Sequence, residues 1–100
     1  MESFDAPIAH VLAIPEYNKQ YIITDAGDLY EIQGPKFTAI TAYGKVKSLK
    51  KIHTILEGVN ADDRVFILNY DGKSPSGFLG IKKIMGEYVA EPPQSACNIM

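Results

Sequence analysis

The ionisable side chains that most resemble a binding site are lysines. Four of them lie close together in the segment 45–51, and a further pair follows in the later part of the chain. They are Lys45, Lys47, Lys50, Lys51, Lys82 and Lys83. Cations gathered on one surface would bind phosphate groups or an acidic protein partner. Lysines opposite an apolar stripe more often form a solvated face, and the net charge of −2 gives no general attraction to nucleic acid. A nucleic-acid partner is therefore not expected.

No pattern typical of a catalytic or metal site accompanies these lysines. The tripeptide Gly72–Ser74 matches the end of a phosphate-binding loop, but Ile67 stands where that motif requires its first glycine. A zinc site needs three or four ligands with local pairing, which His10, His53 and Cys97 do not provide. His53 lies near an apolar stripe and is expected to be packed or partly buried. We therefore expect no enzyme activity, no cofactor and no metal.

The acidic couples and the C-terminal cysteine also favour structural roles. Asp25 and Asp28, like Asp62 and Asp63, lie at predicted turns, where aspartate hydrogen-bonds its own backbone. The last four residues, CNIM, match the pattern for prenylation of Cys97. The preceding AEPPQSA is not basic, however, so the second membrane signal is missing. We expect Cys97 to be an unreactive structural residue.

The composition places the chain among ordinary globular domains. Hydrophobic residues make up 46% and charged residues 22% of the 100 residues, which fit a single domain spanning 1–100. No apolar run approaches the length of a membrane helix, so no membrane partner is expected. The N-terminal stretch is acidic where a signal peptide would be basic, and a lone cysteine is unusual for a small secreted domain. These features predict a cytoplasmic protein.

The chain shows strand patterns on either side of one helical pattern, and no internal repeat. In KVKSLKKIHTILEGV (45–59), apolar residues recur at three- and four-residue steps, as on one face of a helix. Gly58 suits the left-handed residue that ends a helix. Segment 37–43 is compatible with either a strand or a helix. Strands are predicted at 8–14, at 64–70, at 78–84, at 88–90 and on both sides of the turn DAGD. The predicted fold class is α+β, an antiparallel sheet of about five strands with one main amphipathic helix packed on it.

The stretch from Lys73 onward, KSPSGFLGIKKIMGEYVAEPPQSACNIM, resembles the C-terminal half of profilins. The shared pattern is a glycine turn, a strand ending in Ile-Lys-Lys, a second glycine turn, a strand ending near Tyr, then Glu-Pro and Cys-Asn-Met. The matching residues are Gly77, Ile81, Lys82, Lys83, Gly86, Tyr88, Glu91, Pro92, Cys97, Asn98 and Met100. Upstream, YIITDAGDLYEI is similar to the family's early hairpin. The amphipathic helix that precedes this hairpin in profilins has no counterpart here, so the resemblance does not extend to binding of proline-rich ligands.

This resemblance implies a small non-enzymatic protein-interaction domain that binds actin monomers. The residues it places on the actin-facing surface are Lys73, Lys82, Lys83 and Tyr88. The same order of elements fits roadblock and longin modules, which associate with small GTPases. A separate hypothesis is a viral or bacterial accessory protein that binds and inhibits a host protein complex, since such proteins are often small, acidic and without motifs.

Overall fold

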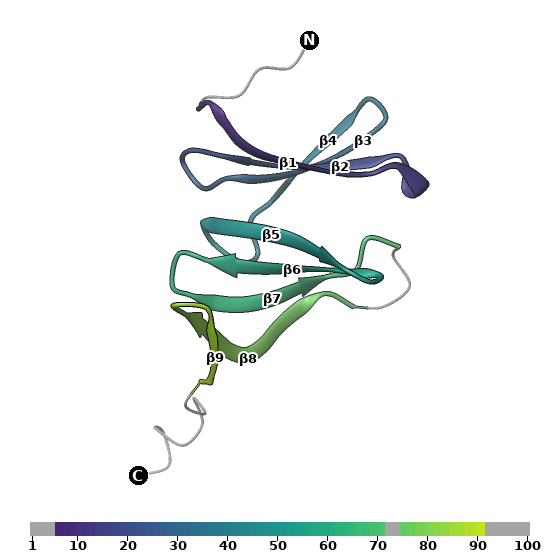
Figure 1. Cartoon of the computed structure of the whole chain (residues 1–100). Coiled ribbons are helices and arrows are strands. Elements are labelled where there is room, and N and C mark those ends of the chain that lie inside the picture. The colour runs from purple at the N-terminus through teal and green to yellow at the C-terminus, as the bar shows by residue number, and fades with distance from the viewer. Residues whose placement is uncertain (1–5, 72–74, 92–100) are drawn as a thin grey trace.

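The computed structural model describes residues 6–71 and 75–91, and Figure 1 shows them as two stacked β-sheets. Within each sheet, every strand pairs antiparallel with the next strand along the chain. The first sheet contains β1 (Ile8–Ile14), β2 (Lys19–Thr24), β3 (Leu29–Gln33) and β4 (Lys36–Ile40), with a 3₁₀ turn η1 (Pro15–Tyr17) between β1 and β2. The second contains β5 (Val46–Ile52), β6 (Ile55–Asn60), β7 (Arg64–Leu68), β8 (Gly77–Ile84) and β9 (Glu87–Ala90). In the described part of the chain, no helix is long and apolar enough to cross a membrane.

The predicted α+β fold class is wrong, because the segment 45–59 forms the hairpin β5–β6 and not a helix. The hairpin turns at His53–Thr54, between the paired residues Ile52 and Ile55. The apolar residues at helical steps lie on both faces of this hairpin: Leu49 and Leu56 face the core, whereas Ile52 and Val59 lie on the other face. Gly58 does not end a helix: it pairs with Phe66 in the middle of the sheet.

The core lies between the sheets and is built from one face of each. Its largest fully buried side chain is Phe66, whose ring stacks on Tyr43 with 4.1 Å between centroids. A Cβ atom on Gly58 would lie 2.1 Å from that ring, so the glycine leaves the space that Phe66 fills. The buried cluster consists of Ile14, Tyr21, Ile23, Leu29, Tyr43, Val46, Leu56, Phe66, Leu68 and Tyr70.

The two sheets share an equivalent turn between their second and third strands. In the first sheet the amide of Gly27 donates to the carbonyl of Thr24, and the amide of Asp28 donates to the Thr24 hydroxyl. In the second sheet Asp63 donates to the carbonyl of Asn60, and the amide of Arg64 donates to the Asn60 side chain.

The fourth residue of each turn has a left-handed backbone conformation, with φ of 87° at Gly27 and 65° at Asp63. Thr24 and Asn60 therefore occupy corresponding positions.

The correspondence extends to the strands that precede these turns. Ile8 pairs with Thr24 and Val46 pairs with Asn60, and a register shift follows each of these pairs. The second residue of each turn also donates its amide to the carbonyl of the residue before the first strand of that sheet. Asp25 donates to Pro7, and Ala61 donates to Lys45. The structure thus shows a tandem repeat of one β-meander, although the sequence shows no internal repeat.

The two meanders stack in the same orientation, so different faces of each meet in the core. Residues of the first sheet that face the core, such as Tyr21, correspond to residues on the far face of the second, such as Glu57. Conversely, Phe66 in the core corresponds to Tyr30 on the outer face of the first sheet. The central rows of this outer face are Val11, Ile22, Tyr30 and Ala39, and Ala13, Gln20, Ile32 and Phe37.

The last strands of the second sheet curl over its far face. Five residues of β8, from Phe78 to Lys82, lie opposite three of β7, from Phe66 to Arg64, and Gly80 within this bulge has φ of 77°. Tyr88 on β9 then reaches Glu57 on β6. These strands would lie about 14 Å apart in a flat sheet, because neighbouring strands are about 4.8 Å apart. The sheet is therefore strongly curved.

Candidate functional site

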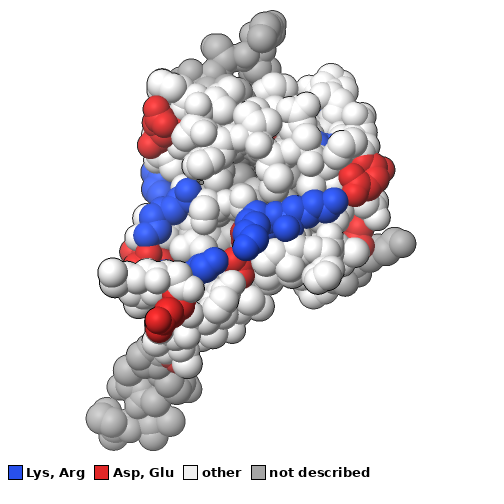
Figure 2. Space-filling model, viewed as in Figure 1, with Lys and Arg blue, Asp and Glu red and all other residues white. Residues whose placement is uncertain are grey.

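The lysines of segment 45–51 do not form a free cationic surface, because carboxylates pair with three of them. Lys45 lies 2.6 Å from Asp28, and Lys51 lies 3.0 Å from Glu16. Lys47 pairs with Asp63. A backbone hydrogen bond and Lys51 hold the pKa of Glu16 below its ordinary value. Figure 2 shows the result as a band of cations across the middle of this face, with acidic residues beside it. Such a mixed surface does not favour phosphate binding.

The histidines and the cysteine do not come together in the described residues. His10 is exposed on β1, and His53 is exposed at the β5–β6 turn with φ of 54°. The prediction that His53 is packed or partly buried is therefore wrong. Segment 45–59 forms a hairpin and not a helix, and His53 lies in the exposed turn of that hairpin. Within the described part of the chain no group of His, Cys, Asp and Glu could hold a metal ion. Cys97 lies outside the described residues.

A buried carboxylate brings two of the predicted site residues together. Glu57 has 7% of its surface exposed, accepts a hydrogen bond of 2.6 Å from the Tyr88 hydroxyl, and lies 3.3 Å from the Lys83 ammonium group. The Lys83 ammonium also lies 5.2 Å from the centre of the Tyr88 ring. The hydrogen bond to Glu57 raises the pKa of Lys83 and that of Tyr88 above their ordinary values. This cluster satisfies the buried carboxylate and fixes the hairpin β8–β9 on the sheet.

Lys82 lies on the opposite face of the hairpin β8–β9 from Lys83 and Tyr88. Its neighbour across the strands is Val89, whereas Lys83 is paired with Tyr88. The predicted set is therefore divided: two residues bind Glu57, and Lys82 points to the other side. Lys73 lies outside the described residues.

The tip of the same hairpin exposes an unusual methionine. Met85 is 98% exposed and has φ of 52°, in a two-residue turn with Gly86 at φ of 84°. Two positive φ angles define the type I′ turn, in which asparagine or glycine is strongly preferred. Methionine here is unfavourable for its backbone conformation and for its contact with water. The neighbouring Ile84 and Val89 are also exposed, at 43% and 46%.

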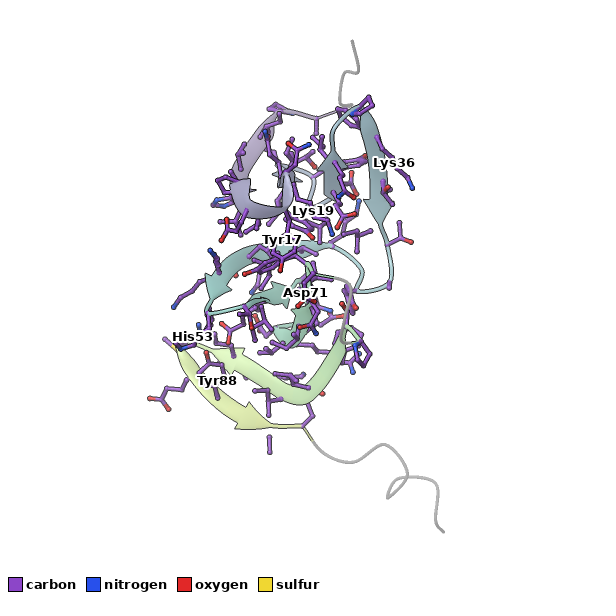
Figure 3. The ribbon with its side chains drawn as sticks, turned by 90° about the vertical axis from the view of Figure 1, so that its right-hand side faces the viewer. Tyr17, Lys19, Lys36, His53, Asp71 and Tyr88 are labelled. Atoms are coloured by element: carbon purple, nitrogen blue, oxygen red, sulfur yellow. The ribbon has the colours of Figure 1, made fainter. Side chains whose placement is uncertain are left out.

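A second polar cluster fills the seam between the sheets, which Figure 3 views directly with Tyr17 and Lys19 above Asp71. Lys19 donates 2.6 Å to the carbonyl of Tyr70 and lies 3.6 Å from Glu31. Glu31 also accepts a hydrogen bond of 2.7 Å from Tyr21. Burial, and then this bond, raise the pKa of the Tyr21 hydroxyl well above its ordinary range. A tyrosine with so high a pKa is no proton acceptor at neutral pH, so the cluster joins the sheets and offers no general base.

A hollow of about 330 Å³ lies between β3, β4 and the connection to β5. The charged groups that line it, Asp28 and Lys45, already form an ion pair with each other. The hollow therefore presents no unpaired charge to a ligand.

Compared with protein-family models, curated proteins and solved structures, the chain matches none of them.

Sequence reasoning identified the hairpin β8–β9 but missed two informative residues, Met85 at its tip and Glu57 on β6 beneath it. Glu57 was assigned to a helix, and a buried carboxylate cannot be recognised until the strand that covers it is known. Met85 could have been found, because the dipeptide Met-Gly in a predicted turn places a large apolar side chain where turn residues are usually polar.

Proposed function

We propose that this chain is a non-enzymatic protein-interaction module that binds its partner through the tip of the hairpin β8–β9. The observation that carries the proposal is Met85, which is fully exposed and left-handed. A large side chain in this conformation costs about 1–3 kcal/mol, and such residues cluster at functional sites. A flexible methionine is also well suited to filling an apolar pocket on a partner.

The surroundings of Met85 define the chemistry of the partner. Ile84 and Val89 extend the exposed apolar surface along one face of the hairpin, and Lys82 lies beside them. The Glu57 cluster anchors the opposite face, so the hairpin is held in position before binding. The surface fits an apolar pocket on a protein, with a carboxylate at its rim to meet Lys82.

Actin stays one proposed partner, and a cytoplasmic location stays a proposal. The profilin resemblance that suggested actin was tied to an α+β architecture, which this chain does not have. The proposal therefore rests on the hairpin and not on the resemblance.

The sharpest test replaces Met85 by asparagine. Met85→Asn creates Asn-Gly, the favoured pair for this turn, so the hairpin should be at least as stable while the apolar tip is lost. The native protein, Met85→Asn and the distant control Val11→Lys are immobilised and exposed to cell lysate and to purified monomeric actin. Any retained protein is then purified, and its affinity is measured by calorimetry.

The expected result is a partner that binds the native protein and Val11→Lys alike and binds Met85→Asn at least about tenfold more weakly, a loss of about 1.4 kcal/mol. Lys82→Glu should weaken the same complex. A partner that binds Met85→Asn as tightly as the native protein would contradict the proposal, and so would the absence of any retained protein. Binding of purified actin with this pattern would identify the partner.

A further inference from the structure

The strand β1 forms one edge of the first sheet, and its composition is unusual for an edge. In the described part of the chain it pairs only with β2, so no strand lies against its other side. Its sequence, IAHVLAI, contains no lysine, proline or acidic residue, and Val11 at its centre is 59% exposed. Sheets usually protect such edges with charged side chains or proline, because bare edges pair with other strands.

The corresponding edge of the second sheet carries this protection. The strand β5 occupies the place of β1 in the repeated meander, with a register shift at the same position. Where β5 has its three lysines, β1 has small or apolar residues. The corresponding pairs are Lys47 and Ala9, Lys50 and Leu12, and Lys51 and Ala13. The edge of β5 is therefore protected by charge, whereas that of β1 can accept another strand.

The backbone of β1 has hydrogen-bonding groups that point away from the sheet. The amide of Thr24, the last residue of β2, donates to Asp28 on the side of β3. Because the amides alternate in direction along a strand, Tyr21 bonds on the opposite side, to its pair Leu12 on β1. Val11, which precedes Leu12, therefore directs its N–H and C=O groups to the outer edge.

The sequence of β1 is nearly the same in both directions. It reads Ile-Ala-His-Val-Leu-Ala-Ile, so only His10 and Leu12, on either side of Val11, break the mirror symmetry. Two antiparallel copies centred on Val11 would place identical side chains opposite each other, except where His10 meets Leu12. Opposite residues of an antiparallel pair contact each other on the same face. The strand is therefore complementary to itself and brings no like charges together.

We propose that β1 pairs antiparallel with β1 of a second copy, in a two-fold dimer centred on Val11. The Val11 residues of the two copies exchange both of their backbone hydrogen bonds across the axis. The first sheets of the two copies then form one continuous sheet. Closed two-fold pairs of this kind are the commonest symmetric assemblies.

Two features should keep this dimer weak. The register shift between Ile8 and His10 distorts one end of β1, so regular pairing covers only the central residues. The strand β5 lies beside β1 in the stack, so the lysines of the two copies also approach one another. Carboxylates of the same chain pair with three of these lysines, which limits the repulsion. Dissociation should therefore lie in the micromolar range or above.

Sedimentation velocity from about 5 to about 500 µM tests the proposal, because this range brackets micromolar dissociation. The native protein should shift from monomer to dimer. Val11→Lys and Val11→Glu should each weaken dimerisation at least about tenfold, because the two-fold axis places two like charges directly opposite each other. An equal mixture of the two variants should restore the dimer, since an ammonium group then faces a carboxylate.

Val11→Pro tests the backbone bonds separately from the side chain. It removes the amide that donates to the second copy but breaks no hydrogen bond to β2, since that amide points to the outer edge. It should give a monomer with thermal unfolding close to that of the native protein. Val89→Lys is the matched control for charge: it also replaces an exposed strand valine, but on the hairpin β8–β9, and should leave dimerisation unchanged.

A native protein that stays monomeric at the highest concentration overturns the proposal. So does a dimer that survives in both Val11→Lys and Val11→Pro, or a mixture of Val11→Lys and Val11→Glu that stays monomeric. A dimer lost in Val89→Lys would form through the hairpin and would contradict the proposal as well. Met85→Asn should dimerise like the native protein, which separates this proposal from the partner-binding function.

Discussion

The two meanders of this chain have the same turn and the same register, but their outer surfaces differ. The second sheet curls until Tyr88 on β9 meets Glu57, and thereby covers its own far face. The first sheet ends at β4, and the central rows of its outer face are mostly apolar. The comparison teaches that backbone hydrogen bonds define the repeated unit, while the side chains at corresponding positions determine what each face contacts.

Replacing corresponding aromatic residues should give the largest contrast. Phe66→Ala should lower the free energy of unfolding by about 3–5 kcal/mol, because Phe66 is completely buried and stacked on Tyr43. Tyr30→Ala, at the corresponding position of the first sheet, should cause a clearly smaller loss because Tyr30 is partly exposed. Urea unfolding followed by circular dichroism measures both. Equal losses would show that the outer face of the first sheet is as well covered as the core.

The next largest difference in stability is expected from replacing the residues that begin the two equivalent turns. The side chain of Asn60 makes three hydrogen bonds, donating to the carbonyl of Tyr43 and accepting from the amides of Asp62 and Arg64. Asn60→Ala should lower the free energy of unfolding by about 2–3 kcal/mol, since each bond contributes about 0.5–1.5 kcal/mol.

Thr24→Ala removes only the bond from the amide of Asp28, so its effect should be near 1 kcal/mol. Denaturant titration of both variants checks the difference. A Thr24→Ala loss as large as that of Asn60→Ala would mean that the number of side-chain hydrogen bonds does not determine how much each residue stabilises its turn.

Gly58 allows the opposite kind of test, in which a side-chain atom is added beside Phe66 and not removed. Gly58→Ala should destabilise the protein by about 1–3 kcal/mol, because the new Cβ collides with the Phe66 ring. Gly77→Ala is the control: its Cβ would meet nothing within 4 Å, so its effect should stay within about 0.5 kcal/mol. Thermal unfolding compares them. A neutral Gly58→Ala would require the ring to move without loss of packing.

The two tyrosine–carboxylate pairs should respond differently to alkali. Glu57 raises the pKa of Tyr88 chiefly through a hydrogen bond, whereas burial comes first for Tyr21. A raised pKa in the folded state means that the stabilisation is complete below the unfolded value of about 10 and is lost as the pH rises through the folded value. Tyr88→Phe should therefore be less stable than the native protein at pH 8, and this difference should vanish above pH 10.

For Tyr21→Phe the difference should persist to higher pH, since burial raises the pKa of Tyr21 further. Urea unfolding at several pH values measures both differences. If the Tyr21→Phe difference vanished at the lower pH, the order of the two pKa shifts would be wrong.

The strands could be predicted from the sequence largely because their signals are local. The prediction of a strand at 8–14 coincides with β1, and the turn DAGD joins β2 to β3 as expected. The helix prediction failed because the spacing of Val46, Leu49 and Leu56 is compatible with a helix, while the pairing of Gly58 with Phe66 is a long-range contact that the local pattern does not contain.

The tandem repeat could not be predicted, because it is carried by the backbone and not by residue identity. Thr24 and Asn60 cap the same turn with different side chains, and Gly27 and Asp63 adopt the same left-handed conformation. The candidate site was half found: Lys82, Lys83 and Tyr88 lie on the predicted hairpin, while Glu57, which holds two of them, was hidden by long-range packing.

The order of the strands has a consequence for how the chain folds. Each strand pairs with its immediate neighbour in sequence, so the sheets form without any long loop closure. Low separation between contacting residues speeds folding, and this chain should fold faster than sandwiches of similar size whose strands cross between sheets. The first meander can also pair its four strands before the second has left the ribosome. The second then docks onto an existing sheet surface, which limits the time that its edges are exposed to other chains.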